Sequence, residues 1–282
     1  MPARFGYSTR VIPVPPYLRN PLRGSGPDAP RQAPIGLSHR GFSRSGAENT
    51  LPAFQAAVDL GFGWLETDVR TTADGVLLAF HDADLDRVSG SSGPVGNRTM
   101  RELADVRVGG QPVPTLEQLL AAWPHIRLNV DVKDAAGVAP LADLIRSHRA
   151  GDRVLVASFS DRRRLAVLRR LRRSGAGPVA SSAGSAFTAL AVLLAPLGGV
   201  GLLARLGRFQ CLQVPRRYGI LPVVTPALIR GCHRAGVQVH VWTINEREQM
   251  EQLLDAGVDG IVSDRADLLA EVLAARGCWP QG

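Results

Sequence analysis

The sequence predicts a distorted (β/α)8 TIM barrel with one extra antiparallel hairpin strand after strand 2. Short apolar runs alternate with longer helical patterns along most of the chain, which is typical of βα units around a parallel sheet. The length of 282 residues suits one large barrel domain. A hydrophobic fraction of 45% and a charged fraction of 21% are those of a globular protein with a large core.

The elements are predicted from apolar periodicity and from the turn residues that bound each run. The strand-like runs cover nine ranges: 35–39, 64–71, 76–81, 127–133, 153–158, 178–182, 211–214, 237–244 and 260–263. The first helical run begins where Asn49 or Thr50 can cap it. The helical runs cover eight ranges: 50–60, 115–122, 138–148, 162–173, 187–206, 225–235, 246–256 and 266–275.

Nine strands are one more than the barrel holds, and the surplus is the run 76–81. A parallel connection needs about a dozen residues, so 64–71 and 76–81 lie too close in sequence for one. Asp74-Gly75 is a strong signal for a two-residue hairpin turn, so 76–81 should fold back antiparallel. This register places His81 opposite Asp68, and a shift of one residue would move His81 to the other face.

Three regions are expected along the chain. Residues 1–34 are rich in proline and arginine and lack the apolar run of a signal peptide, which predicts a loosely ordered leader. Residues 35–275 form the barrel, and residues 276–282 form a C-terminal tail.

The net charge of +8 does not by itself indicate nucleic-acid binding. Only one of the 33 basic residues is a lysine, aromatic residues make up 5%, and the two kinds are not interleaved for base stacking. The three cysteines are widely spaced and form neither a metal pair nor a disulfide framework, which favours a reducing compartment. We expect a cytoplasmic protein, with no nucleic-acid partner and no obligate protein partner.

Two segments leave peripheral contact with an anionic membrane open. Residues 179–204 carry no charge, but Pro196 and several glycines interrupt them, which favours a packed barrel helix over a membrane span. A helix with an exposed apolar side, touching lipid or an apolar substrate, is the alternative. Residues 162–173 hold seven arginines, with leucines at helical spacing. They form either an outer barrel helix with a solvated face or an amphipathic helix on anionic lipid.

Polar side chains gather at the ends of the predicted strands, where barrels of this class carry their active sites. His39 and Arg40 end the first strand. Glu66 and Asp68 share one face of the second, and His81 ends the hairpin. Asn129, Asp131 and Lys133 share one face of the next parallel strand.

These residue types point to phosphate chemistry. Three carboxylates at neighbouring strand ends suit one divalent cation, Mg²⁺ or Ca²⁺, although pairing with nearby arginines is the alternative. Lys133, the only lysine, is suited to a phosphate oxygen as a point charge. His39 and His81 are candidates for a general acid and a general base. The other histidines receive no role.

The strand-end residues belong to longer motifs that resemble the glycerophosphodiester phosphodiesterase family, whose fold is a phosphodiesterase barrel. The resemblance covers roughly residues 35–273 in order and spacing. It rests on Ser-His-Arg-Gly at 38–41, Glu-Asn-Thr-Leu-Pro-Ala-Phe at 48–54, Glu-Thr-Asp-Val at 66–69, Phe-His-Asp at 80–82, Leu-Asn-Val-Asp-Val-Lys at 128–133, Val-Trp-Thr-Ile-Asn at 241–245 and Gly-Val-Asp-Gly-Ile-Val-Ser-Asp at 257–264.

The resemblance implies roles for nine residues. They are an acid–base pair (His39, His81), metal ligands (Glu66, Asp68, Asp131), phosphate-binding cations (Arg40, Lys133), a pocket wall (Trp242) and a residue near the site (Glu48). The implied reaction is metal-dependent hydrolysis of glycerophosphodiesters to sn-glycerol 3-phosphate and an alcohol, within lipid and glycerol metabolism. The first attack comes either from the glycerol 2-hydroxyl or from water.

Two positions depart from the family pattern. Ala47 replaces a usual proline, and Asp131 stands where glutamate is more usual and where the related sphingomyelinase D group has aspartate. Asp131 keeps the substrate class open, and the apolar stretch 187–206 motivates a lysophospholipase D or sphingomyelinase D-like reaction on acylated lipids as an alternative. A non-enzymatic binder of anionic membrane surfaces, through 162–173, is a further one.

Overall fold

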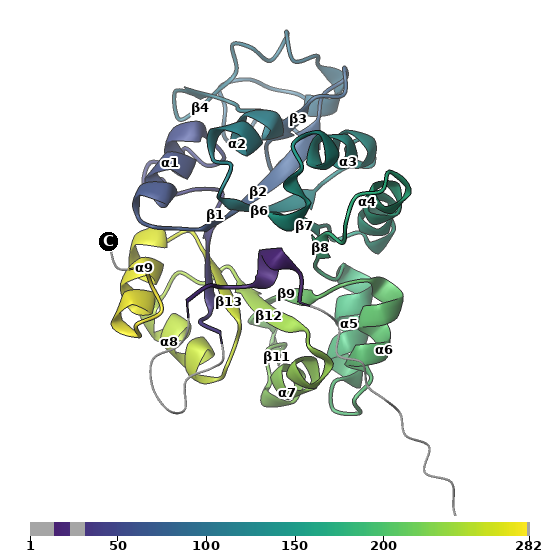
Figure 1. The fold of residues 1–282 in the computed structure, drawn as a ribbon. Coiled ribbons are helices and arrows are strands. Elements are labelled where there is room, and N and C mark those ends of the chain that lie inside the picture. Colours follow the sequence, from purple (N-terminus) through teal and green to yellow (C-terminus); the bar gives the residue numbers. More distant parts are fainter. Residues whose placement is uncertain (1–13, 23–31, 281–282) are drawn as a thin grey trace, which may run out of the picture.

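A ring of eight parallel strands forms the centre of the protein, and helices surround it (Figure 1). The computed structural model describes residues 14–22 and 32–280. The order of the strands around the ring is β8 (Ala180–Ser181), β7 (Val154–Ala157), β6 (Arg127–Val132), β2 (Trp64–Thr71), β1 (Ile35–His39), β13 (Gly260–Ser263), β12 (Gln238–Trp242) and β9 (Cys211–Pro215). A parallel bridge between Ser182 and Cys211 links the two ends, so the barrel is nearly closed. The predicted TIM barrel is confirmed.

The helices lie between successive strands, as βα units require. They are α1 (Leu51–Asp59), α2 (Leu116–Ala122), α3 (Val138–Ser147), α4 (Asp161–Arg173), α5 (Ser185–Leu194), α6 (Val200–Gly207), α7 (Pro226–Ala235), α8 (Arg247–Asp255) and α9 (Ala266–Ala275). Short 3₁₀ turns are η1 (Pro16–Leu18), η2 (Val95–Asn97) and η3 (Ala150–Asp152). Thr50 caps α1, because its hydroxyl accepts a hydrogen bond from the Ala53 amide.

The inside of the barrel is divided into an apolar half and a polar half. Residues from six strands pack together at the end where the strands begin, among them Ile35, Leu37, Trp64 and Leu155. Further along β1 and β2 the inward positions are polar, as with His39 of β1 and with Glu66 and Asp68 of β2. The lower half therefore stabilises the barrel, and the upper half is left for chemistry.

The described part of the leader closes the apolar half. Tyr17 and Leu18 of η1 are buried in the same cluster, and the Trp64 indole donates a hydrogen bond to the Tyr17 carbonyl oxygen at 3.0 Å. η1 lies across the middle of the ring in Figure 1. Tyr17 and Leu18 are thus packed against the barrel, because the strand ends offer an apolar surface. The rest of the predicted leader, 1–13 and 23–31, lies outside the described residues.

The C-terminal tail also returns to the barrel. The rings of Trp279 and Phe62 pack edge to face with centroids 4.7 Å apart. The Trp279 indole donates to the Leu60 carbonyl oxygen at 3.1 Å. Of the predicted tail, residues 276–280 lie within the described part of the chain.

The extra hairpin strand is confirmed, but its predicted register is wrong by one residue. β3 (Leu77–Ala79) runs antiparallel to β2, and Thr71 pairs with Leu77. The Phe80 amide donates to the Asp68 carbonyl oxygen, so Phe80 and not His81 lies opposite Asp68.

The turn chemistry explains this register. Gly75 has φ of +83° and its amide donates to Thr72, while the Thr72 amide donates to Val76. The loop therefore has three residues, 73–75, instead of two. The slip does not turn His81 away from the site, because β3 ends at Ala79 and the following chain is no longer bound by strand alternation.

Two small hairpins were not predicted from the sequence. β4 (Arg107–Val108) pairs with β5 (Gln111–Pro112), and β10 (Arg217–Tyr218) pairs with β11 (Leu221–Pro222). Two-residue strands carry too little periodicity to be recognised. The first lies in a segment that has its own small core over β3, made by Leu78, Phe80, Leu85, Val95, Leu103, Val106, Val108 and Val113.

The single helix expected over 187–206 is wrong, since α5 and α6 are separate. The chain turns between Leu194 and Val200, where Pro196 cannot continue the hydrogen-bond ladder and Gly198 adopts φ of +76°. Among the helices in the described ranges, none has the length and apolar character needed to cross a membrane.

The basic segment forms the outer helix α4, whose apolar side packs on the core of the barrel. Val167 and Leu171 are buried in the main core. Arg164 is fully buried as well, where its guanidinium pairs with Asp161 at 2.8 Å. The buried part of the apolar face of this helix therefore packs on the barrel.

Leu18→Ala is expected to lower the free energy of unfolding by about 2–5 kcal/mol, since it opens a cavity where η1 plugs the barrel. Urea denaturation of the full chain measures this. Leu197→Ala is the matched control: this leucine is exposed, so its loss should change stability by no more than about 0.5 kcal/mol. Equal effects of the two substitutions would contradict the role given to η1.

Candidate active site

The strand register brings the predicted site residues together at the carboxyl ends of β1, β2 and β6. His39 pairs with Glu66 across β1 and β2, and Glu66 in turn pairs with Asn129 of β6. One step higher, Asp68 pairs with Asp131. Neighbouring parallel strands lie about 4.8 Å apart, so inward side chains at paired positions face the same small space.

The loop after β1 is shaped to present Arg40. Arg40 adopts a left-handed φ of +57°, and its amide donates to the Glu66 carbonyl oxygen at 3.0 Å. Gly41 follows with φ of +82°, and a Cβ atom there would lie 2.6 Å from the Ala53 carbonyl carbon. Only glycine fits so close to α1, which explains the His-Arg-Gly order.

Lys133 holds two of the carboxylates together. Its Nζ lies 2.8 Å from Asp68 Oδ1 and 2.7 Å from Asp131 Oδ2. On the other side, Arg40 Nε lies 2.9 Å from Asp68 Oδ2. Burial by itself raises the pKa of Asp68, but the charges of Lys133 and Arg40 outweigh it and lower the pKa below its ordinary value.

The negative charges of Glu66 and Asp131 are less well compensated by neighbouring cations than the charge of Asp68. Burial, with the charge of Asp68, raises the pKa of Glu66 to about 8. Burial also raises the pKa of Asp131, and Lys133 offsets this only in part. Glu66 Oε2, Asp131 Oδ1 and Asn129 Oδ1 are buried and lack a hydrogen-bond partner.

The chemistry of these unpartnered atoms suits a divalent cation, although the side chains as placed here do not surround one. All three are oxygens, and two belong to carboxylates, which is the donor set that Mg²⁺ and Ca²⁺ prefer. In the arrangement seen here Lys133 occupies the space between Asp68 and Asp131. Within residues 14–22 and 32–280, no three His, Cys, Asp or Glu side chains converge closely enough to hold a metal.

His39 is positioned by a residue from the far end of the chain. Its Nδ1 lies 2.6 Å from Asp264 Oδ1, and its Nε2 lies 3.7 Å from Glu66 Oε2. Asn245 holds Asp264 in turn, because its amide donates to Asp264 Oδ2 at 2.8 Å. Burial lowers the pKa of His39, but the Asp264 hydrogen bond and the charge of Glu66 outweigh it, so the pKa is raised.

His81 belongs to a network that connects three loops. Its Nδ1 lies 2.7 Å from Asp82 Oδ1, and Arg87 bridges from Asp82 to Glu48 at 2.5 and 2.6 Å. Glu48 Oε1 also accepts from Arg40 at 2.9 Å. The His81 imidazole lies near enough for its charge to lower the pKa of Asp68. Glu48 therefore connects the His81 side of the site to Arg40.

Trp242 lies at the rim with an exposed neighbour. Its ring packs edge to face against Phe159, with centroids 5.9 Å apart. Phe159 follows β7, and its ring lies 5.4 Å from Lys133 Nζ. Lys133 is thus flanked by two carboxylates and one aromatic ring, and Trp242 lies beyond that ring.

Sequence reasoning missed five residues of this arrangement. Asp264 and Asn245 stand in motifs that were recognised, and a carboxylate at a strand end could have been tested as a partner for His39. Asp82 is adjacent to His81 in sequence, which was a usable signal. Arg87 and Phe159 lie in loops, and no local pattern marks them.

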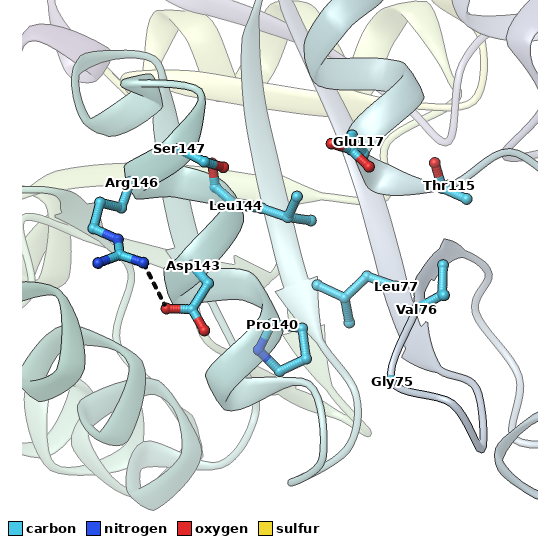
Figure 2. Close-up of a pocket in the computed structure, with 10 residues that line it drawn as sticks. All are labelled: Gly75, Val76, Leu77, Thr115, Glu117, Pro140, Asp143, Leu144, Arg146 and Ser147. Carbon is cyan, nitrogen blue, oxygen red and sulfur yellow. Dashed lines mark hydrogen bonds and ion pairs between the residues drawn. The ribbon is translucent and has the colours of Figure 1, made fainter.

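A separate cavity of about 360 Å³ lies outside the barrel. Figure 2 shows its lining from α2, α3 and the turn before β3, with Asp143 and Arg146 paired at 3.6 Å. None of the nine predicted site residues lines it. The cavity is therefore distinct from the strand-end cluster.

Comparison with known proteins agrees with this fold and shows the family to which the chain is related. Residues 39–268 match the glycerophosphoryl diester phosphodiesterase family. The chain is 46% identical over 248 residues to the probable glycerophosphodiester phosphodiesterase 2 of Mycobacterium tuberculosis, covering 87% of this chain and 92% of that protein. It is 24% identical to the rat lysophospholipase D GDPD1, over 84% of this chain and 85% of that one.

Solved structures show the same fold. A glycerophosphodiester phosphodiesterase from Agrobacterium tumefaciens superposes with a TM-score of 0.70 at 26% identity, over 86% of this chain and 99% of that one. An Oleispira antarctica phosphodiesterase was solved with its product sn-glycerol-3-phosphate. It superposes with a TM-score of 0.70 at 21% identity, over 86% of this chain and 97% of that one.

Fold and site together define a barrel hydrolase of phosphoric diesters. The chain belongs to the glycerophosphoryl diester phosphodiesterase family.

Asp264→Asn is expected to lower the pKa of the His39 imidazole, because the hydrogen bond that raises it is then made to a neutral group. A side-chain NMR titration of the full chain measures this. Asp82→Asn serves as the matched control, since Asp82 contacts His81 instead. An unchanged His39 titration in Asp264→Asn would show that the pair is not formed.

Stability without divalent cation is expected to fall as pH rises from about 5 to about 8. The pKa of Glu66 is about 8 in the folded chain and 4.5 ordinarily, so the folded state binds more protons across this interval. Thermal unfolding in EDTA measures the fall, and Glu66→Gln should reduce it. Added Mg²⁺ or Ca²⁺ should raise the midpoint more at the higher pH. A midpoint of thermal unfolding that changes neither with added cation nor with Glu66→Gln would contradict this account.

Proposed function

We propose that the protein hydrolyses glycerophosphodiesters to sn-glycerol 3-phosphate and an alcohol, using one divalent cation and the pair His39 and His81. The observation that carries the proposal is the cluster at the strand ends. Two histidines, each paired with its own aspartate, accompany buried carboxylates and two cations. The product bound to the Oleispira antarctica relative supports the same choice of substrate class.

Arg40 and Lys133 are assigned to the phosphate. Both are half-buried at the mouth, and both are held by carboxylates rather than by backbone. A phosphodiester oxygen entering the site would exchange for part of these ion pairs. The ammonium of Lys133 acts as a point charge, whereas the planar guanidinium of Arg40 can bind two oxygens at once.

Glu66, Asp68 and Asp131 would hold the cation, and Asn129 would add a neutral oxygen. When bound, a divalent cation polarises a phosphate oxygen and offsets charge that develops on it. Its binding would also compensate Glu66 and Asp131, whose raised pKa values reflect burial without a sufficient counter-charge. Asp131 would hold the cation with a side chain one methylene shorter than that of the glutamate more usual at this position in the family pattern.

The histidines divide the proton transfers. The Asp264 hydrogen bond favours the protonated form of His39, so we assign His39 to donate a proton to the leaving oxygen. His81 then accepts the proton of the attacking hydroxyl, with Asp82 holding its Nδ1 edge. The attacking hydroxyl is the glycerol 2-hydroxyl or water.

A lysophospholipase D reaction is the second candidate. The exposed Phe159 beside Trp242 gives the mouth an apolar wall that a deacylated substrate does not need. The named activity of the rat relative at 24% identity is consistent with it. Comparing rates on lysophosphatidylcholine and glycerophosphocholine separates the two.

A cytoplasmic location remains part of the proposal. It rests on the three cysteines, which are buried and unpaired.

His39→Ala and His81→Ala are each expected to slow glycerol 3-phosphate release from glycerophosphocholine by about 10²–10⁴-fold. The assay is run with Mg²⁺ or Ca²⁺ and again with excess EDTA, which should abolish release. His148→Ala is the control, because His148 pairs with Glu117 on the outer helices. Losses below about tenfold in both folded variants would refute the two-histidine assignment.

A further inference from the structure

An apolar hairpin projects from the rim of the barrel without serving the core. It comprises β10, β11 and the two residues between them, and it follows directly from β9. Tyr218, Ile220 and Leu221 are 77, 85 and 63% exposed. Large apolar side chains gathered at one exposed tip are typical of an interaction site.

The hairpin stands beside the catalytic mouth. Pro215, the last residue of β9 and two positions before the hairpin, pairs with Trp242 of β12. Trp242 packs against Phe159, and Phe159 covers Lys133. An apolar path therefore runs from the phosphate-binding lysine over the rim to the base of the hairpin.

The base of the hairpin is anchored, and the tip is free. The amides of Val223 and Val224 donate to the Arg216 carbonyl oxygen at 3.1 and 3.4 Å, and both valines pack against the main core. The Arg217 guanidinium closes the turn by donating to the Ile220 carbonyl oxygen. The fold thus holds the tip outward without using its side chains.

The charge at the hairpin is positive and uncompensated. Arg216 donates to the neutral amide oxygen of Gln252 at 3.2 Å, and Arg217 binds a backbone carbonyl. Neither guanidinium forms an ion pair with an acid in the part of the chain that the structure describes, unlike Arg87 or Arg265 near the same mouth. The net charge of +8 adds to the local field.

We propose that this hairpin docks the enzyme on the surface of an anionic phospholipid bilayer. Tyr218, Ile220 and Leu221 enter the interfacial region, while Arg216 and Arg217 face the lipid phosphates. The catalytic mouth then opens toward the membrane. A second copy of the chain fits the hairpin less well, because a symmetric contact would bring like-charged arginines together. The docking does not depend on the proposed reaction, which concerns the strand ends.

The test is flotation of the full chain with phosphatidylcholine vesicles, with and without phosphatidylglycerol. We expect binding to the anionic vesicles that weakens with salt. The double substitution Ile220→Ser and Leu221→Ser should lower the partition coefficient by about tenfold or more. Arg216→Gln with Arg217→Gln should remove the preference for anionic vesicles.

The matched control is Leu193→Ser with Leu197→Ser, which removes exposed leucines on and after α5. This variant should bind vesicles as the unchanged chain does. All variants should keep their rate on soluble glycerophosphocholine, which shows that they are folded. If the unchanged chain lacks that rate yet still floats, the proposed function fails and the docking stands.

Three outcomes would overturn the docking. The first is absence of binding by the unchanged chain, and the second is an equal loss in the control variant. The third is a concentration-dependent dimer, seen by light scattering, that the hairpin variant abolishes while vesicle binding persists; the hairpin would then contact a second copy.

Discussion

The ammonium group of Lys133 is the point on which the site depends. It lies between Asp68 and Asp131, at 2.8 and 2.7 Å, inside a barrel mouth that shields charges from water. Carboxylates placed this close repel one another and resist ionisation unless a cation compensates them. A compact ammonium can reach two carboxylates on adjacent strands, whereas a planar guanidinium would impose its own geometry. Burial and the neighbouring negative charge raise the pKa values of Glu66 and Asp131, which shows that Lys133 and Arg40 do not fully compensate the charge of this cluster.

The barrel makes this concentration of charge tolerable. The apolar cluster below, with Trp64 and the η1 residues Tyr17 and Leu18, keeps the strands in place while their upper inward positions are polar. The register of the strands places the polar side chains in two layers. Glu66 pairs with Asn129 in the lower layer, and Asp68 pairs with Asp131 in the upper one. The packing of the apolar half of the barrel thus offsets the repulsion among the buried carboxylates of the polar half.

Residues in the loops hold the two histidine rings in place. Asp264 and Asp82 each bind one histidine, and Glu48 connects the His81 side to Arg40 through Arg87. These contacts fix the orientation of both imidazole rings, which loops anchored only at their ends would not do. The rim beyond these loops is different in character, with exposed aromatic and aliphatic side chains at Phe159 and the β10–β11 hairpin.

Local sequence features were enough to predict the alternation of strands and helices, the extra strand after strand 2 and the residue types at the strand ends. Those features are local: they depend on periodicity, turn residues and side-chain chemistry over a few positions. The bounds of β1, β2, β13 and α9 agree with prediction for this reason. Tertiary structure decided what depends on distant contacts. Asp264 reaches His39 across 225 positions, and η1 finds the apolar end of the barrel only once the strands close. Turn geometry set the register of β3 and the break between α5 and α6. In each turn a glycine with positive φ, Gly75 or Gly198, determines where the chain reverses, and the apolar pattern around it does not.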